Sequence, residues 1–405
     1  MLERPPFKRC PKCLTDDAFG ILWVGGSSLT RRCKRCSHKL YYDLPNLKKK
    51  VIYLDQNAIS NIFRISSQNS ARSGSNDALW NKITDLSRRT FLLQQIVFPL
   101  SDIHRDETLV YIHSESLNLA HEMLSGDVSF VDSEKIIISQ TLDFLEKFLS
   151  GEPPPKIDFD IEEAIEGSKD TWMPDLHVTA SMNMSVFADQ IRSERDAIGP
   201  AYENLLRYWE EQRPSFQTAL RTELDGYGTE NKKALQAIAK ELATAIERGD
   251  LDASMRATSK RLYKQFILLC DHIEQAGYSR KEAILKIFDF WSWEGNTQLP
   301  HNKISSYLFA ALARRISSGQ RKHPGVSIFN DFRVISTYAP YVDAMFLDNE
   351  CANLLNEEPL KTELALSSKI FSAKSGDRFI AYLEQIEANT PGEVRAWASE
   401  IYDLN

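Results

Sequence analysis

Two Cys-x-x-Cys pairs near the amino terminus constrain the fold of this chain more than any other feature. They consist of Cys10, Cys13, Cys33 and Cys36. Each pair offers two sulfur ligands from one tight turn, and zinc favours four such thiolates in a tetrahedron. A segment this short buries too little apolar surface to fold alone, so metal binding must supply much of its folding free energy. We therefore predict a zinc ribbon over residues 1–47, with a structural zinc because four ligands leave no open position.

The rest of the cysteine and apolar content indicates the cellular setting. Six cysteines among 405 residues are too few for a disulfide scaffold, which favours a reducing compartment. The sequence has no apolar run of about 18 residues and no apolar stretch after its first charges. We expect a cytoplasmic protein with no secretory signal and no membrane contact.

Charge is divided unevenly along the chain. The whole sequence holds 49 Lys and Arg against 56 Asp and Glu, a net charge of −7. Residues 1–50 hold 12 basic and 4 acidic residues, a net charge of +8, so the other 355 residues carry −15. Basic and aromatic residues gather at the second cysteine pair: Arg31, Arg32, Lys34, Arg35, Lys39, Tyr41 and Tyr42. This mixture suits phosphate contacts and base stacking on a nucleic acid. Two plainer alternatives are a solvated charged face and tyrosines that only pack against the next domain.

Several short apolar runs lead into acids. Residues 51–54 are followed by Asp55, and residues 342–347 by Asp348. A further apolar run over 95–101 precedes Glu107, with a helix expected to begin near Asp106, and Asp331 stands at the start of a short helix predicted over 330–339. Such runs are typical of buried strands in an α/β sheet, where polar side chains at the carboxyl ends of strands form the site.

The order of these acids resembles that of the PIN-domain nucleases. The matching positions are Asp55 with Asn57, Ser101 with Glu107, Asp331 with Ala339, and Asp348. The resemblance covers about 51–125 and 300–385, and it departs from the family by one extra residue before Ala339 and by a long insertion. It implies a parallel α/β sheet whose acids, here Asp55, Glu107, Asp331 and Asp348, hold Mg²⁺ or Mn²⁺ and cleave RNA or, in some branches, DNA.

The chemistry of gathered acids supports the same reading independently. Four carboxylates brought together repel one another and lose solvation, a cost that a hard divalent cation removes. Such a cation can also activate water for attack on a phosphodiester. No glycine-rich phosphate loop or nucleophile elbow is present, which leaves metal-assisted hydrolysis as the fitting class.

Two more acids compete for a place in this site. In an extended strand Asp343 would face away from Asp348 and stand roughly 16 Å from it, so we hold Asp343 in reserve. Asp102 and His104 fit capping or packing roles better than metal binding. These assignments leave Asp55, Glu107, Asp331 and Asp348 as the predicted catalytic and metal-binding set.

The middle of the chain has helical periodicity, over 134–150, 193–208, 231–248, 255–276 and 280–293. We expect a PIN-like parallel sheet core, flanked by helices and formed by residues 50–127 and 301–405, with a helical insertion over 128–300. The insertion could shape a substrate channel or bind a protein partner.

The sequence thus predicts a metal-dependent endoribonuclease whose zinc ribbon contacts RNA. A structure-specific DNA nuclease is the enzymatic alternative, and a catalytically silent adaptor for nucleic acid or protein is the third. The presence of all four acids disfavours the silent adaptor, because gathered carboxylates without a metal only destabilise a fold.

Overall fold

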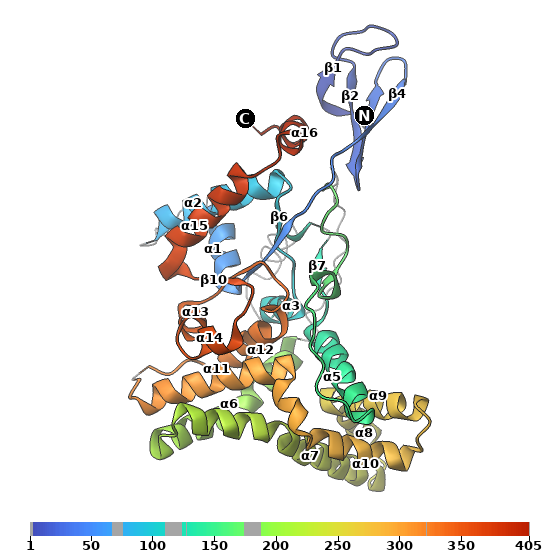
Figure 1. Ribbon diagram of the computed structural model, residues 1–405. Helices are drawn as coiled ribbons and strands as arrows, with labels where there is room; N and C mark the ends of the chain where they lie inside the picture. The colour runs from blue at the N-terminus through green and yellow to red at the C-terminus, as the bar shows by residue number, and fades with distance from the viewer. Residues whose placement is uncertain are drawn as a thin grey trace.

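The computed structural model describes residues 3–66, 76–109, 124–126, 128–173, 188–320 and 322–404. A four-stranded parallel sheet lies at its centre (Figure 1). In spatial order the strands are β10 (Lys369–Phe371), β9 (Ala344–Phe346), β5 (Lys50–Leu54) and β6 (Ile96–Val97). The predicted α/β class with a parallel sheet is confirmed.

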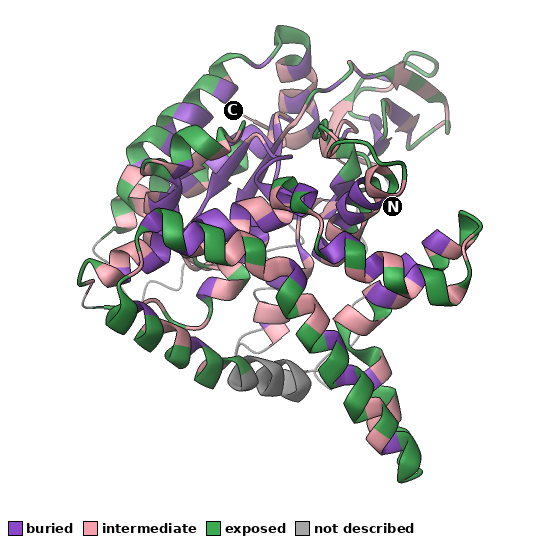
Figure 2. Cartoon of the chain, turned by 60° about the horizontal axis from the view of Figure 1, so that its bottom comes forward, coloured by how far each residue is buried: buried purple, intermediate pink, exposed green. Residues whose placement is uncertain are grey.

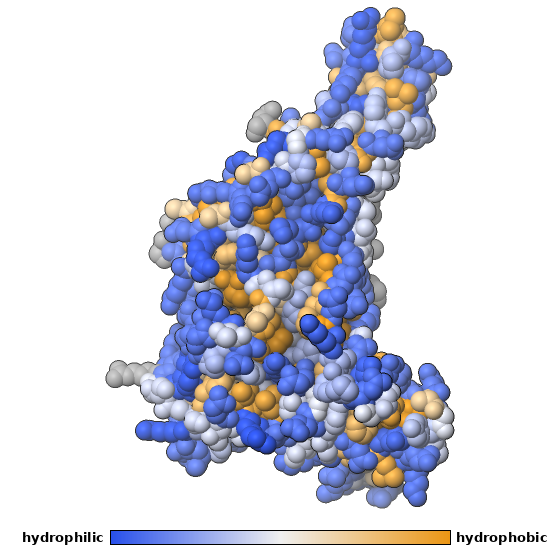
Figure 3. Space-filling view, viewed as in Figure 1, coloured by the Kyte–Doolittle hydropathy of each residue, from blue (hydrophilic) through white to orange (hydrophobic). Residues whose placement is uncertain are grey.

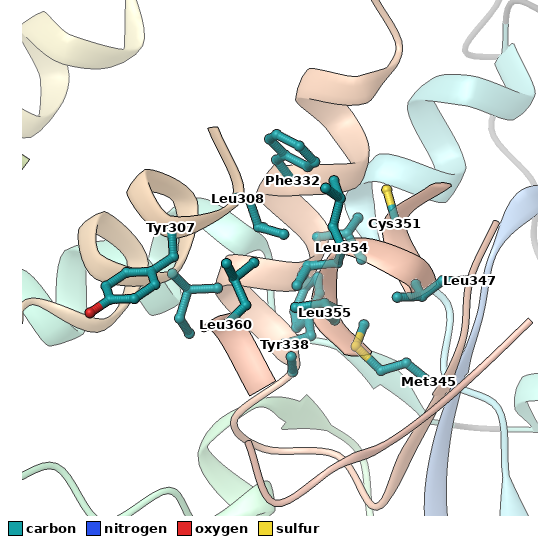
Figure 4. Close-up of a cluster of buried hydrophobic side chains, with 14 of the residues drawn as sticks. Tyr307, Leu308, Phe332, Tyr338, Met345, Leu347, Cys351, Leu354, Leu355 and Leu360 are labelled. Carbon is teal, nitrogen blue, oxygen red and sulfur yellow. The ribbon is translucent and has the colours of Figure 1, made fainter. Parts of the chain in front are cut away.

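Helices cover both faces of this sheet, which explains why β5 reads as an unbroken apolar run. Ile52 and Leu54 face one core, and Val51 and Tyr53 face the other. The first core is closed by α1 (Gln56–Ser66), α2 (Asp77–Leu92) and α15 (Gly376–Ala388). The second is closed by α5 (Ser133–Leu149), α11 (Pro300–Ser317), α12 (Ile328–Tyr338), α13 (Asn349–Asn356) and α14 (Leu360–Leu364). Figure 2 shows the buried strands between these layers, and Figure 4 shows side chains of the second core.

Two predicted boundaries near β6 differ from the structure. Regular pairing in the predicted strand 95–101 is limited to Ile96–Val97, because Pro99 has no N–H to continue a ladder. Helix α3 (Asp102–Leu109) begins at Asp102 and not near Asp106, since the Ser101 hydroxyl accepts from the backbone N–H of His104 at 3.2 Å.

The predicted helical insertion has a core of its own. Besides α5, its helices are α6 (Ala188–Gln212), α7 (Phe216–Glu247), α8 (Leu251–Ser259), α9 (Arg261–Gln275) and α10 (Arg280–Trp291), with a short 3₁₀ turn at Glu294–Gln298. Its core is formed by apolar residues of α5, α7, α9 and α10. The single helix predicted over 255–276 is broken at Lys260. Gly228 of α7 allows a close approach to α10, because a Cβ there would lie 1.7 Å from the Trp291 carbonyl oxygen.

Helix α11 joins this helical region to the sheet. It starts at the predicted boundary, yet it packs on α6 and α7 as well as on α12 and α13. The two regions therefore share one helix. Within the described ranges no helix combines the length and apolar character that crossing a membrane requires.

The amino-terminal ribbon is a four-stranded antiparallel sheet of β1 (Arg4–Lys8), β2 (Phe19–Gly25), β3 (Ser28–Cys33) and β4 (Lys39–Asp43). It docks on the carboxyl-terminal helix α16 (Gly392–Tyr402) and on Trp172, whose indole N–H donates to the Pro45 carbonyl oxygen at 2.9 Å.

The chain before Trp172 departs from the helical prediction for 128–300. It contains the strands β7 (Ser129–Phe130) and β8 (Ile165–Glu166) and a 3₁₀ turn at Ile161–Glu163. Elsewhere, a further 3₁₀ turn, Ala373–Ser375, precedes α15. The chain before Trp172 returns to the ribbon because the 1% exposed Trp172 side chain completes the apolar core beneath β2 and β3.

Two residues predicted to face nucleic acid are instead part of this docking surface. Arg31 is 1% exposed, donates to the Pro6 carbonyl oxygen at 2.7 Å, and forms an ion pair with Glu400 of α16. The Tyr42 ring packs against Trp397, with ring centroids 5.9 Å apart. A buried cation with its partner is a structural element, so Arg31 is not available to a nucleic acid. The Tyr42 contact agrees with the plainer alternative, in which a tyrosine packs against the next domain.

Candidate metal centres

The four amino-terminal cysteines converge as predicted. Their sulfur atoms all lie within 4.8 Å of one another. The Cys10–Cys36 sulfur distance is 3.6 Å, and the Cys13–Cys33 distance is 3.7 Å. A tetrahedral zinc with bonds of about 2.3 Å places its sulfurs about 3.8 Å apart, so the cluster could hold a metal such as zinc.

Both cysteine turns have the same backbone geometry. The N–H of Leu14 donates to the Cys10 carbonyl oxygen at 3.0 Å, and that of Ser37 donates to the Cys33 carbonyl oxygen at 2.9 Å. Leu14 and Ser37 share the left-handed φ of 56°. In addition, the Cys36 N–H points at the Cys33 sulfur at 3.5 Å. Hydrogen bonds with Thr15 lower the pKa of Cys13 to about 6, which favours the thiolate that binds metal.

The second centre begins with two acids at the carboxyl ends of adjacent strands. Asp55 follows β5 directly, and its N–H donates to the Phe346 carbonyl oxygen at 2.9 Å, which keeps β5 and β9 in register. The Asp55 carboxylate accepts from the Ala58 N–H at 2.6 Å, and Asp348 accepts from the Cys351 N–H at 2.7 Å. Each carboxylate therefore caps the helix that follows its strand, where the helix dipole favours negative charge.

The other two predicted acids come from helices. Asp331 lies in the first turn of α12, and its carboxylate is within 4.8 Å of Asp348 and the Cys351 sulfur. Glu107 lies on α3 and accepts a hydrogen bond from the side chain of Asn330, the neighbour of Asp331, at 3.2 Å. This bond ties the α3 acid to the α12 acid.

Electrostatics show that the four acids act on one another. Burial and then the charges of Asp348 and Glu107 raise the pKa of Asp55 to about 7. Burial and then the charges of Asp348, Glu107 and Asp55 raise the pKa of Asp331 well above its usual value. The charges of acids in four separate segments thus act on one another at the carboxyl ends of the strands. Of the four, Asp331 and Asp348 have oxygens within 4.8 Å of each other, and Asp55 and Glu107 lie outside that group. Residues 67–75 and 110–123 of the resembling span lie outside the described part.

A buried histidine positions Glu107. His104 Nε2 donates to the Leu54 carbonyl oxygen at 2.7 Å, and its Nδ1 lies 3.1 Å from the Ser101 hydroxyl. The ring stacks on Tyr53 with centroids 4.8 Å apart, and burial lowers the pKa of His104 to about 4. The neutral ring joins α3 to the end of β5 one helical turn before Glu107.

Asp343, the acid held in reserve, and Asp102, expected to cap or pack, have partners of their own. Asp343 precedes β9, where it bonds to the Val51 N–H at 2.9 Å and to Lys50 at 2.8 Å, at the opposite edge of the sheet. Asp102 accepts from the hydroxyls of Ser133 at 2.6 Å and Tyr338 at 2.9 Å.

Asn57, two residues after Asp55, is hydrogen-bonded within its own helix. It is exposed on α1, where its side-chain oxygen accepts from Asn61 at 2.9 Å.

The sequence reasoning missed two neighbours of the acids. Asn330 orients Glu107, and only its position beside Asp331 hinted at this role. Cys351 follows Asp348 by three residues, the spacing at which a cap and the N–H it binds occur. Burial and the charges of Asp331 and Asp348 raise the pKa of Cys351 well above its usual value, so a neutral thiol lies beside the carboxylates.

Comparison with known proteins returned no match: no protein-family model fits the sequence, and no curated protein or solved structure is significantly similar to the chain.

We predict that Cys33→Ser lowers the zinc content of the purified protein from about one ion per chain, because the tetrahedral set loses a ligand. Metal analysis by mass spectrometry measures the change. Cys270→Ala, which alters a buried cysteine of the helical region, is the control and should keep the wild-type content. An unchanged zinc content in Cys33→Ser would contradict the ligand assignment.

We also predict that Asp55→Asn stabilises the protein when divalent cations are omitted. Since folding raises the pKa of Asp55 from 3.8 to about 7, ionising this carboxyl costs stability as the pH rises through that interval. At about 1.4 kcal/mol per pKa unit the gain at pH 8 is on the order of 2–4 kcal/mol, and it shrinks as the pH falls. Urea denaturation of both proteins against pH measures it.

The control is Asp343→Asn. Asp343 precedes β9, at the amino ends of the strands, whereas Asp55 lies at their carboxyl ends. Asp343 is paired with Lys50, so its neutralisation should give no such gain. If Asp55→Asn were less stable than the wild type at pH 8, the penalty that burial and the neighbouring acids impose on the Asp55 charge would be absent.

Proposed function

We propose that the protein is a metal-dependent phosphodiesterase with a PIN-like core, most specifically an endoribonuclease. The observation that carries this proposal is the convergence of Asp55, Glu107, Asp331 and Asp348, with the pKa values of Asp55 and Asp331 raised by the surrounding acids. Perturbed acids gathered at the carboxyl edge of a parallel sheet are typical of a catalytic site.

The donor set fits Mg²⁺ or Mn²⁺. Carboxylate oxygens are the ligands that these cations prefer, and Asp331 and Asp348 already bring such oxygens within 4.8 Å of each other. A bound divalent cation would supply charge neutralisation and the activation of water for in-line hydrolysis. The chain itself holds Asp55 and Asp348 at helix N-termini and orients Glu107 through Asn330.

The ribbon suits the role of a nucleic-acid reader held by a structural zinc. Trp23 and Tyr41 are 49% and 73% exposed, and both pair in register with Thr30, so they lie on one face of the ribbon sheet. Arg32 pairs with Lys39 two residues along β3 from Thr30, so these two residues lie on the same face. Exposed rings flanked by cations form a platform for stacked bases and phosphates.

This platform is separated from the acids. The linker from the ribbon enters β5 at its amino end, whereas Asp55 and Asp348 follow the carboxyl ends of β5 and β9 (Figure 1). The ribbon would therefore contribute affinity for a long strand and take no part in bond cleavage.

We predict that the purified protein cleaves labelled single-stranded RNA with Mn²⁺ and not without divalent cation. Asp55→Asn and Asp348→Asn should each slow cleavage by roughly a hundredfold or more, because each removes an oxygen charge from the metal site. Both substitutions keep the capping oxygen, so folding is preserved. Gel analysis of product formation gives the rates.

Asp343→Asn serves as the matched control. It should cleave at the wild-type rate, since Asp343 lies at the amino ends of the strands, away from the four acids. Cleavage of DNA but not RNA would transfer the assignment to a DNA nuclease. Binding without cleavage under any divalent cation would favour an adaptor, and full activity of Asp55→Asn would remove the proposed site.

We further predict that Tyr41→Ala and Trp23→Ala weaken binding of long single-stranded RNA. Loss of one stacked base costs about 1–3 kcal/mol, which is a roughly 5- to 150-fold loss of affinity. Fluorescence anisotropy in the Asp55→Asn background measures binding without cleavage. Tyr42→Phe, which keeps the ring against Trp397, should bind like its parent. Unchanged affinity in the Tyr41→Ala, Trp23→Ala double variant would rule out the platform.

A further inference from the structure

A hollow lies beside the edge strand β10, away from the acids. It occupies about 520 Å³ between the α13–α14 pair and α15, and Figure 3 shows apolar surface recessed there among hydrophilic side chains. Leu355, Leu360 and Phe371 contribute apolar lining, and none of the four converging acids contributes. Its volume is that of a typical pocket for a small molecule.

Positive charge gathers around this hollow in a chain that is acidic overall. Lys361, Lys369 and Arg378 line it from α14, β10 and α15, and no acidic residue lines it. None of the three forms an ion pair within the described residues. Lys369 lies over the Tyr382 ring, with its Nζ 4.6 Å from the centroid. Three cations without counter-charges, brought together by three elements, favour an anionic ligand.

The backbone of β10 adds a donor and an acceptor. Lys369 donates to the Asp343 carbonyl oxygen and Phe371 accepts from the Leu347 N–H, so the groups of Ile370 between them point to the open side of the sheet. Addition of a peptide strand is disfavoured, because β10 has three residues and offers only this one outward pair. A compact ligand with one hydrogen-bonding edge fits better.

We propose that this hollow is a binding site for a small phosphorylated ligand of mononucleotide size. Lys361 and Arg378 receive the phosphate, and the Ile370 peptide groups meet the edge of a base over the apolar lining. The site goes beyond the proposed nuclease function, since it uses the flank of the sheet and none of the predicted catalytic acids.

Isothermal titration calorimetry of the full chain with AMP and, separately, with inorganic phosphate tests this site, in buffer without added divalent cation. We expect saturable binding of AMP and weaker binding of phosphate, which lacks the base. Arg378→Gln and Lys361→Gln should each weaken AMP binding by about tenfold, the effect of one charge-assisted hydrogen bond. Both side chains are exposed, so the variants should fold, and circular dichroism checks this.

Two controls separate this site from the acid cluster. Lys281→Gln removes an exposed charge from the helical region and should leave AMP affinity unchanged, as should Asp55→Asn. Three results would each overturn the proposal: no saturable AMP binding at millimolar concentration, equal affinity for phosphate and AMP, or binding lost in Asp55→Asn but retained in Arg378→Gln. Failure of RNA cleavage would leave these results unaffected.

Discussion

The cost of burying several carboxylates near one another is the constraint on which the arrangement of this protein depends. Asp55 and Asp331 are driven toward protonation by burial and by their acidic neighbours. A fold keeps such a cluster only when other interactions hold each acid in place. Here these interactions are the register of β5 with β9, the helix starts that Asp55 and Asp348 cap, and the Asn330–Glu107 bond.

The helices behind the sheet hold these interactions together. Helix α11 packs on α12, which carries Asp331, and on α13, which begins directly after Asp348. It also packs on α6 and α7 of the helical region. The neutral His104 fixes α3 to the end of β5. The helical region is thus in contact with the elements that hold the acids.

The ribbon shows how one small module divides its residues between attachment and recognition. Alternation along β3 and β4 sends Arg31 and Tyr42 toward α16 and leaves Arg32 and Tyr41 on the opposite face of the ribbon sheet. The same alternation determines which backbone groups of β10 point away from β9. Those of Ile370 do, and they face the hollow. In both places a period of two assigns adjacent residues to different tasks.

The sequence by itself determined the features that depend on local spacing. Two Cys-x-x-Cys turns place their sulfurs together because each turn is short, and an apolar run ending in Asp55 or Asp348 already implies a buried strand with an acid at its end. Only the tertiary structure decided which distant segments meet. It sent Asp343 to the far edge of the sheet, buried Arg31 against Glu400, and made α11 common to two regions. Such outcomes depend on packing between elements far apart in the chain, for which no local pattern carries a signal.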